Sequence, residues 1–173
     1  VQTLDGQTRA LDSEMVLIED AEGPTSIAGL MGGARSEVAP DTTTVLLEVA
    51  NWDGPNIHRS SWALGLRSEA SARFEKGLAP EQCMHAQALA TRLMIELCGA
   101  SVAPGTIDVG EPPPAAQPIP LRSERVRAIL GVEVTPERQR EILTALDFTV
   151  SGGGGELQVS VPAERRNDVS REI

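Results

Sequence analysis

Alternating apolar and polar residues predict strands in the first part of the chain. Two short apolar runs, 14–20 and 24–30, are separated by the turn sequence Ala-Glu-Gly at 21–23. The clearest alternation lies at 44–52, where apolar side chains at every second position share one face. An apolar run at 102–109 also predicts a strand. We therefore expect a β-rich first domain.

Helical signals separate and follow these runs. Residues 56–64 are expected to form a helix that ends at Gly65, and the charged segment 68–77 predicts a short turn or helix. The strongest helix is predicted at 80–98, and Gly99 follows it as a stop signal. Its apolar face is expected to consist of Cys83, Ala86, Ala90, Leu93 and Leu97.

A proline-rich segment divides the chain. Residues 110–120 contain five prolines, which can neither continue a helix nor donate to a strand ladder. This composition predicts an extended linker. The predicted domains are therefore 1–109 and a shorter, truncated module at 121–173.

The segment after the linker predicts two helices and a hairpin. Ser123 is expected to cap a helix that is closed by Gly131, with Val126, Ile129 and Leu130 directed inward. Thr135 followed by proline is a typical start of a second helix. Glycines at 152–155 then join two strands, which gives a helix-turn-helix with a wing. The predicted fold class is α+β, with a barrel-like first domain, flanking helices and a small winged module.

Charge argues against a free-standing nucleic-acid-binding protein. The chain has a net charge of −10, of which residues 1–120 carry −9 and residues 121–173 carry −1. Phosphate contacts supply most non-specific affinity for nucleic acids, and an acidic surface opposes them. Any tRNA is therefore expected to be held mainly by other parts of a larger assembly.

The cysteines and apolar runs indicate a cytoplasmic location. Cys83 and Cys98 lie 15 residues apart in one predicted helix, too far apart for a disulfide. No apolar run approaches the ~20 residues of a membrane span. Because the chain opens at Val1 and closes straight after a charged run, we also expect it to be a middle piece of a longer protein.

Familiar catalytic motifs are missing from the sequence. The glycines at 32 and 33 are not followed by Lys-Ser or Lys-Thr, and there is no Gly-x-Ser-x-Gly. His58 and His85 have no metal-ligand spacing around them and are expected to be surface or cap residues. Glu48 is the exception, because it interrupts an apolar strand and must be solvated, paired or hydrogen-bonded there.

Three runs in the first domain resemble the editing domain of bacterial phenylalanyl-tRNA synthetase β subunits. They are Ile-Ala-Gly-Leu-Met-Gly-Gly at 27–33, Leu-Leu-Glu-Val-Ala-Asn-Trp at 46–52, and Gly-Leu-Arg-Ser-Glu-Ala-Ser-Ala-Arg-Phe-Glu-Lys-Gly at 65–77. The runs occur in the family's order and near its spacing. Residues 121–166 resemble the helix-turn-helix-like module that follows the editing domain in this family.

The resemblance implies hydrolysis of tyrosine that has been wrongly esterified to tRNA(Phe). It implies that Glu48 recognises the tyrosine hydroxyl and that Gly32 lets the backbone approach the ligand. It places Ser68 at a position where many relatives carry threonine, and Ala70 in the pocket wall. A buried acceptor favours tyrosine, because phenylalanine would leave a desolvated carboxylate unpaired. We therefore expect Glu48 to line a water-poor cavity beside Gly32 and Ala70.

The family also implies what the chain lacks. The histidine near the hydrolytic centre lies upstream of the matched region, so neither His58 nor His85 corresponds to it, and the isolated chain is expected to be inactive. The resemblance also implies that aminoacylation belongs to the α subunit of an α2β2 holoenzyme that uses ATP and Mg²⁺. No cofactor is expected in this chain, and the expected partners are the α subunit and tRNA(Phe), with no membrane.

Asp168 belongs to an Arg-x-Asp element that the family associates with a structural Mg²⁺. The other carboxylates of that site lie beyond Ile173, and one carboxylate does not hold Mg²⁺. Asp168 is therefore expected to be a solvated surface residue here. Two other interpretations stay open: a non-catalytic module, at 121–166, that binds nucleic acid or another subunit, and a free-standing trans-editing protein.

Overall fold

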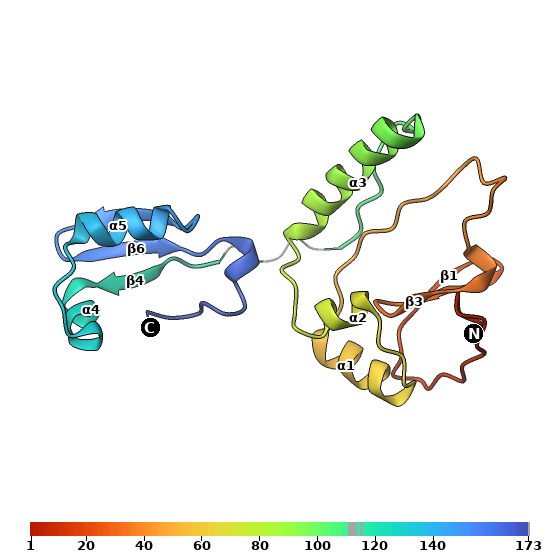
Figure 1. Cartoon of the computed structure of the whole chain (residues 1–173), viewed down its shortest axis with the longest axis horizontal. Coiled ribbons are helices and arrows are strands. Elements are labelled where there is room, and N and C mark those ends of the chain that lie inside the picture. Colours follow the sequence, from red (N-terminus) through yellow and green to blue (C-terminus); the bar gives the residue numbers. More distant parts are fainter. Residues whose placement is uncertain (111–113, 115, 173) are drawn as a thin grey trace. The chain divides into compact units, whose positions relative to one another are not determined.

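The computed structural model describes residues 1–110, 114 and 116–172, which divide into two compact units, Val1–Gly105 and Thr106–Ile173. Each unit combines a small antiparallel sheet with helices, so the predicted α+β class is confirmed (Figure 1). Among the described residues, no helix is long and apolar enough to cross a membrane.

A three-stranded antiparallel sheet opens the first unit. Its strands are β1 (Leu17–Asp20), β2 (Gly23–Ile27) and β3 (Met31–Gly32), in the order β1-β2-β3. The predicted pair of strands around the turn at 21–23 is confirmed, with shorter bounds. The short helix η1 (Ala34–Ser36) follows. This sheet does not close into a barrel among the described residues, so the barrel-like arrangement expected for the first domain is not present.

Three helices follow the sheet, at the predicted positions. They are α1 (Gly54–Ala63), α2 (Glu69–Phe74) and α3 (Gln82–Cys98). The Asp53 carboxylate accepts a hydrogen bond from the backbone N–H of Asn56 at 2.9 Å and caps the start of α1. Gly99 ends α3 in the left-handed conformation, as its stop signal predicts.

The core of the first unit lies where the turn after β2 meets α1. Its buried members are Ile27, Leu30, Ile57 and Leu66, and half-buried Trp52 and Phe74 pack against them. Gly29 (φ +68°) sits at the centre of this contact: a Cβ atom there would lie 2.7 Å from Cδ1 of Ile57. Only glycine allows this approach without displacing a core side chain.

Two predicted strands are wrong. Residues 44–52 and 102–109 form no strand, and Leu46 and Val109 are 89% and 90% exposed. A strand needs a neighbour that pairs with its backbone, and the described chain places none beside these segments. The apolar face predicted for α3 is likewise uncovered, since no residue of this helix is buried. In Figure 1, α3 stands away from β1–β3 of its own unit.

The second unit is a winged module. Its elements are β4 (Ile119–Arg122), α4 (Ser123–Leu130), α5 (Pro136–Thr144), β5 (Thr149–Gly153), β6 (Glu156–Ser160) and η2 (Ala163–Arg165). The hairpin β5–β6 is extended by β4, so the sheet order is β4-β6-β5. The Thr135 hydroxyl caps α5, as predicted. Ser123 is the first residue of α4 and not its cap, because Arg122 occupies the N-cap position, so the predicted cap is wrong. Ile129 and Leu130 are 53% and 59% exposed, so their predicted inward direction is wrong.

The predicted linker at 110–120 overlaps this unit. β4 begins at Ile119, inside the predicted linker, because Ile119 pairs with Val159 of β6. Residues 110, 114 and 116–118 form neither helix nor strand, and the rest of the linker, 111–113 and 115, lies outside the described residues. The core of the unit consists of Phe148, Leu157 and Val159.

Replacement of Gly29 by alanine tests the central contact of the first unit. Gly29→Ala is expected to lower the free energy of unfolding by about 1–3 kcal/mol through overpacking, in addition to about 1–2 kcal/mol of backbone strain. Gly65 is the matched control, because its φ of +57° is similar but a Cβ atom there meets nothing within 4 Å. Urea unfolding followed by circular dichroism measures both variants. Equal losses in the two would show that the contact is not tight.

The pH dependence of the second unit tests an ion pair at its sheet edge. Glu172 contacts the Arg122 side chain and accepts from the Arg122 backbone N–H at 2.7 Å. The hydrogen bond from the Arg122 side chain, first of all, lowers the pKa of Glu172 from 4.5 to about 2. Because the folded-state pKa is depressed, the stabilisation is present above about pH 4.5 and is lost as the pH falls towards 2.

Thermal unfolding between pH 2 and 7 measures this effect. Glu172→Gln is expected to be less stable than the parent chain at pH 6, and the difference should vanish near pH 2. Glu164→Gln is the control, because the exposed Glu164 side chain makes no ion pair among the described residues. A difference between parent and Glu172→Gln that stays constant over the whole range would contradict the assignment.

Candidate functional site

The hydroxyl of Ser68 ties the start of α2 to the glycine-rich turn. Its Oγ donates to the carbonyl oxygen of Leu30 at 2.6 Å and accepts from the backbone N–H of Ser71 at 3.1 Å. Ser71 returns the contact, because the backbone N–H of Ser68 donates to its Oγ at 2.9 Å. This capping box fixes the first turn of α2, and the bond to Leu30 attaches that turn to the glycine-rich segment. Ser68 therefore holds the turn two residues before Gly32.

Gly32 lies against the side chain of Leu4. A Cβ atom on Gly32 would lie 3.0 Å from Cδ1 of Leu4, and the backbone N–H of Leu4 donates to the Gly32 carbonyl oxygen at 3.0 Å. Leu4 is 47% exposed. The open side of Gly32 is therefore bounded by one flexible apolar side chain, which a larger residue at position 32 would have to displace.

Glu48 is exposed in this structure. It lies in the extended segment 44–52 and makes no hydrogen bond or ion pair among the described residues. The expectation that it lines a water-poor cavity is therefore wrong for the described chain, because no element covers that segment. Ala70 is also exposed, in the first turn of α2. The structure connects Ser68 to the turn that carries Gly32, and it records no contact that joins Glu48 or Ala70 to them.

A charged cluster beside α1 escaped the sequence patterns. Arg67 donates to both carboxylate oxygens of Glu75, at 3.2 and 2.7 Å, and His58 Nδ1 lies 3.3 Å from the same group. The hydrogen bond from Arg67, and then that from His58, lowers the pKa of Glu75. The three residues are 8 to 17 positions apart, so no local spacing reveals them. The Glu75 side chain is only 12% exposed, and the cluster joins α1 to the end of α2.

Asp168 is exposed and bonded to an arginine. Its carboxylate accepts from Arg165 Nε at 3.0 and 3.3 Å. Within 1–110, 114 and 116–172, no group of three or more His, Cys, Asp or Glu side chains is arranged to hold a metal ion. The surface position expected for Asp168 agrees with this geometry, and its guanidinium partner competes with any cation.

Most arginines of the winged module are engaged by the module itself. Arg140 of α5 donates to the carbonyl oxygens of Val150 and Gly152, both at 2.6 Å, and so braces the wing. Arg138 pairs with Glu141, and Arg122 with Glu172. These contacts leave few free cations for phosphate groups on this face of the described module.

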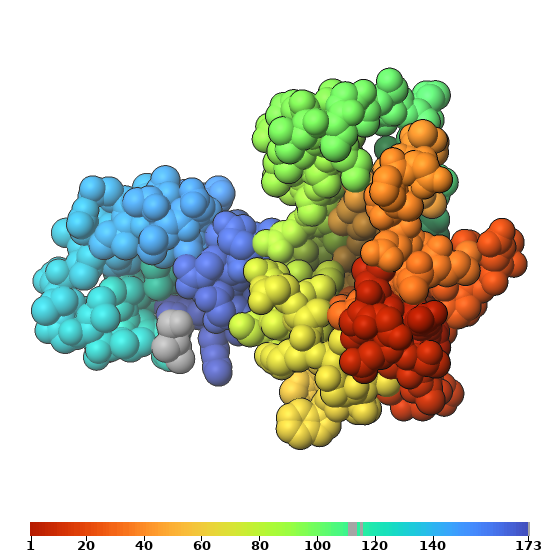
Figure 2. Space-filling model, turned by 45° about the vertical axis from the view of Figure 1, so that its right-hand side comes forward, coloured from red at the N-terminus to blue at the C-terminus, as the bar shows by residue number. Residues whose placement is uncertain are grey.

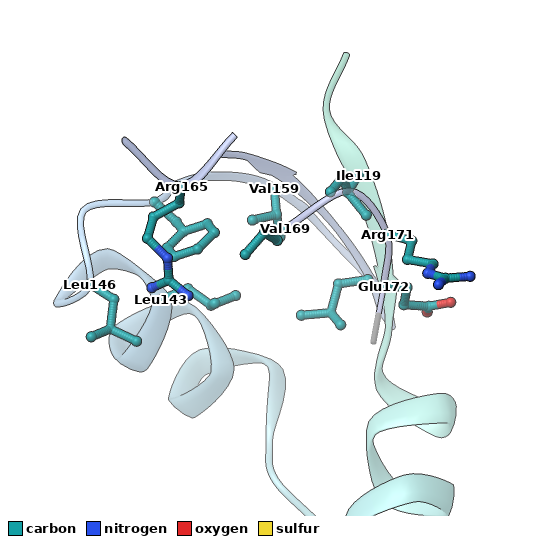
Figure 3. A pocket seen from close by; sticks show the side chains of 10 residues that line it. Ile119, Leu143, Leu146, Val159, Arg165, Val169, Arg171 and Glu172 are labelled. Carbon is teal, nitrogen blue, oxygen red and sulfur yellow. The ribbon is translucent and has the colours of Figure 1, made fainter. Parts of the chain in front are cut away.

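The same unit holds an apolar pocket of about 260 Å³. Figure 3 shows Val159, Val169 and Leu143 around its floor, with Arg165 at one edge and Arg171 and Glu172 at the other. The Arg165 guanidinium lies 5.7 Å from the centre of the Phe148 ring. The pocket lies between α5, the sheet and the segment 165–172.

Comparison with known proteins matches both units to families. Residues 1–99 match the B3/4 domain, and residues 119–173 match the tRNA synthetase B5 domain. The phenylalanine–tRNA ligase β subunit of Moorella thermoacetica is 48% identical over 173 residues, which are 100% of this chain and 21% of that protein. That of Salinibacter ruber is 43% identical over 170 residues, 98% of this chain and 20% of that protein.

The relatives are much longer than the chain. In Symbiobacterium thermophilum, the phenylalanine–tRNA ligase β subunit is 45% identical over 148 residues, which are 86% of this chain and 17% of that protein. The chain thus spans about a fifth of the length of the curated relatives that it matches. It belongs to the phenylalanine–tRNA ligase β-subunit family, and it carries that family's B3/4 domain match followed by a B5 domain match.

Proposed function

We propose that the first unit forms part of an editing site that hydrolyses tyrosine wrongly esterified to tRNA(Phe). The observation that carries the proposal is the B3/4 match over residues 1–99 in a chain whose relatives are phenylalanine–tRNA ligase β subunits. The Ser68 bond to Leu30 supports it, because it fixes the Gly32 turn against α2 at the positions where the resemblance expects a pocket.

Glu48 is the proposed selector for tyrosine. A carboxylate that accepts from the phenolic hydroxyl stabilises bound tyrosine, whereas phenylalanine would leave the carboxylate unpaired. This selectivity requires a desolvated carboxylate. The neighbours Val45 and Leu46 are 51% and 89% exposed, which is costly for side chains of this kind. We propose that other polypeptide of the intact subunit covers this segment and, with it, Glu48.

Ser68 and Ala70 complete the proposed pocket, with Gly32 as the position of close approach. The Ser68 hydroxyl already donates to Leu30 and accepts from Ser71, so its proposed role is to hold the pocket wall rather than to attack the ester. Ala70, two residues later in the sequence, offers a small exposed side chain. The water that attacks the ester is proposed to be held by groups outside these 173 residues.

The remaining roles belong to the proposed holoenzyme. We place aminoacylation, with its ATP and Mg²⁺, in the α subunit of a cytoplasmic α2β2 ligase that binds tRNA(Phe). The winged module at 121–173 is proposed to contact protein, because most of its arginines are engaged within the module itself. Asp168 is proposed as one ligand of a structural Mg²⁺ that needs further carboxylates.

Substitution of Glu48 in the full-length subunit tests the proposal. Glu48→Ala is expected to slow hydrolysis of tyrosyl-tRNA(Phe) by about 10- to 100-fold, since a hydrogen bond to a charged group contributes about 1.5–3 kcal/mol. Glu48→Gln should lose less, because its amide oxygen still accepts. A deacylation assay with mischarged tRNA measures both variants.

Glu37→Ala is the control, because Glu37 is an exposed carboxylate of the same unit. Hydrolysis of phenylalanyl-tRNA(Phe) by each variant reports selectivity. Unchanged tyrosine hydrolysis in Glu48→Ala, with unchanged rejection of phenylalanine, would remove Glu48 from the proposed site.

A further inference from the structure

The two tryptophans of the chain have opposite environments. Trp52 is half-buried and packs against the core of the first unit. Trp62, in α1, is 83% exposed. The chain contains only two tryptophans, two phenylalanines and no tyrosine, so an aromatic ring in solvent is a large part of its aromatic surface. The exposed indole offers a flat apolar face to a binding partner.

The ring projects from a firmly anchored helix. One side of α1 is buried through Gly54, Ile57, Ser60 and Ser61. The Ser61 hydroxyl donates to the Leu66 carbonyl oxygen at 2.7 Å, which fixes the end of the helix. Figure 2 shows the segment that contains α1 and α2, in yellow, on the outer surface of its unit. Trp62 is therefore presented from a rigid support, and binding to it requires little ordering of the backbone.

A histidine and an arginine are neighbours of Trp62 on the outer face of α1. His58 and Arg59 precede it by four and three residues, so they are its neighbours on the helix surface, and both are exposed. Arg59 makes no ion pair among the described residues. Together, Trp62, Arg59 and His58 form a surface that we call the Trp62 platform.

The charge of this region is opposite to that of its surroundings. Residues 54–68 contain two arginines and His58 but no Asp or Glu, whereas residues 1–120 as a whole carry a net charge of −9. Arg67 contacts the Glu75 carboxylate, which offsets its charge, so Arg59 supplies the positive charge beside the ring. An exposed aromatic ring among cations is the combination that binds single-stranded nucleic acid, through stacking and phosphate contacts.

We propose that the Trp62 platform binds an unpaired nucleotide of RNA, whose base stacks on the indole while Arg59 contacts a neighbouring phosphate. The inference rests on the proposed function, because a tRNA that enters an editing site brings its unpaired 3′ end to this unit. The binding contact is local: the ring stacks on the face of one base, and one or two cations contact the RNA backbone. Neither contact depends on the base sequence. A protein partner that packs against the ring is the competing occupant, and the measurements below separate it from RNA.

Variants of Trp62 in the full-length β subunit, assembled with its α subunit, test the platform. The probes are uncharged tRNA(Phe) and a fluorescein-labelled single-stranded RNA hexamer. Trp62→Ala is expected to raise the Kd for both about fivefold or more, whereas Trp62→Phe should retain most of the affinity because phenylalanine still stacks. Since the side chain is 83% exposed, neither change removes core packing.

Arg59 is tested by the salt dependence of the same binding. Arg59→Ala is expected to reduce the slope of log K against log salt concentration by about 1. Arg92→Ala is the matched control, because Arg92 is an exposed arginine of α3 that pairs with Glu96 at 3.7 Å, and it should leave the slope unchanged. Equal slopes for Arg59→Ala and the parent would contradict a phosphate contact.

An unchanged Kd in Trp62→Ala would overturn the proposal, and a weakened association of the subunits in that variant would assign the ring to a protein interface instead. Loss of affinity in Trp62→Phe equal to that in Trp62→Ala would exclude stacking. Because these Kd values are measured with uncharged RNA, they do not depend on Glu48. A negative result in the Glu48 deacylation assay therefore does not change the interpretation of these Kd values. Likewise, unchanged Kd values do not affect the proposed role of Glu48.

Discussion

The first unit depends on the close approach of α1 to the turn at Gly29. A Cβ atom at this position would meet both Ile57 and Trp52 within 2.8 Å, so the helix seats on the turn only because a glycine is there. This contact decides which side of α1 faces the core. It therefore decides that Trp62 and Arg59 face outward, and that α2 can reach Leu30 through Ser68. The two proposed sites are consequences of the same packing.

The sequence predicted those elements whose signals are local. The turn at 21–23 lies between its own two strands, and Thr135 caps the helix that it begins. Each of these features is stabilised by residues within a few positions, so the local sequence contains both of the groups that interact. The hairpin around 152–155 belongs to the same class.

The failures share one physical cause. The alternation at 44–52 describes the faces of a strand, but it does not supply the neighbour that a strand requires. The apolar stripe of α3 has helical spacing, but spacing does not say what covers it. Of the candidate site, the Ser68 connection is absent from the pattern because its acceptor is 38 residues away. The cluster of Arg67, Glu75 and His58 was missed for the same reason.

Exposure of Glu48 and exposure of Trp62 have different meanings for function. A selector carboxylate discriminates only after water has been removed from it, so its exposure means that the proposed pocket needs polypeptide beyond the described residues. A stacking ring must be open to solvent before the base arrives, so its exposure is the competent state.

The net charge of the first unit decides how much long-range attraction and how much stacking contribute to RNA binding at the proposed Trp62 platform. A unit that is strongly acidic gains little from long-range attraction to RNA, and salt screens each charge over a Debye length of ~10 Å. Short-range stacking must then supply most of the local affinity, because it does not depend on the net charge. In our proposal, this surface holds an RNA end that other parts of an assembly have already delivered, and it releases the end readily. That behaviour suits a site that must sample each tRNA and return the correct ones.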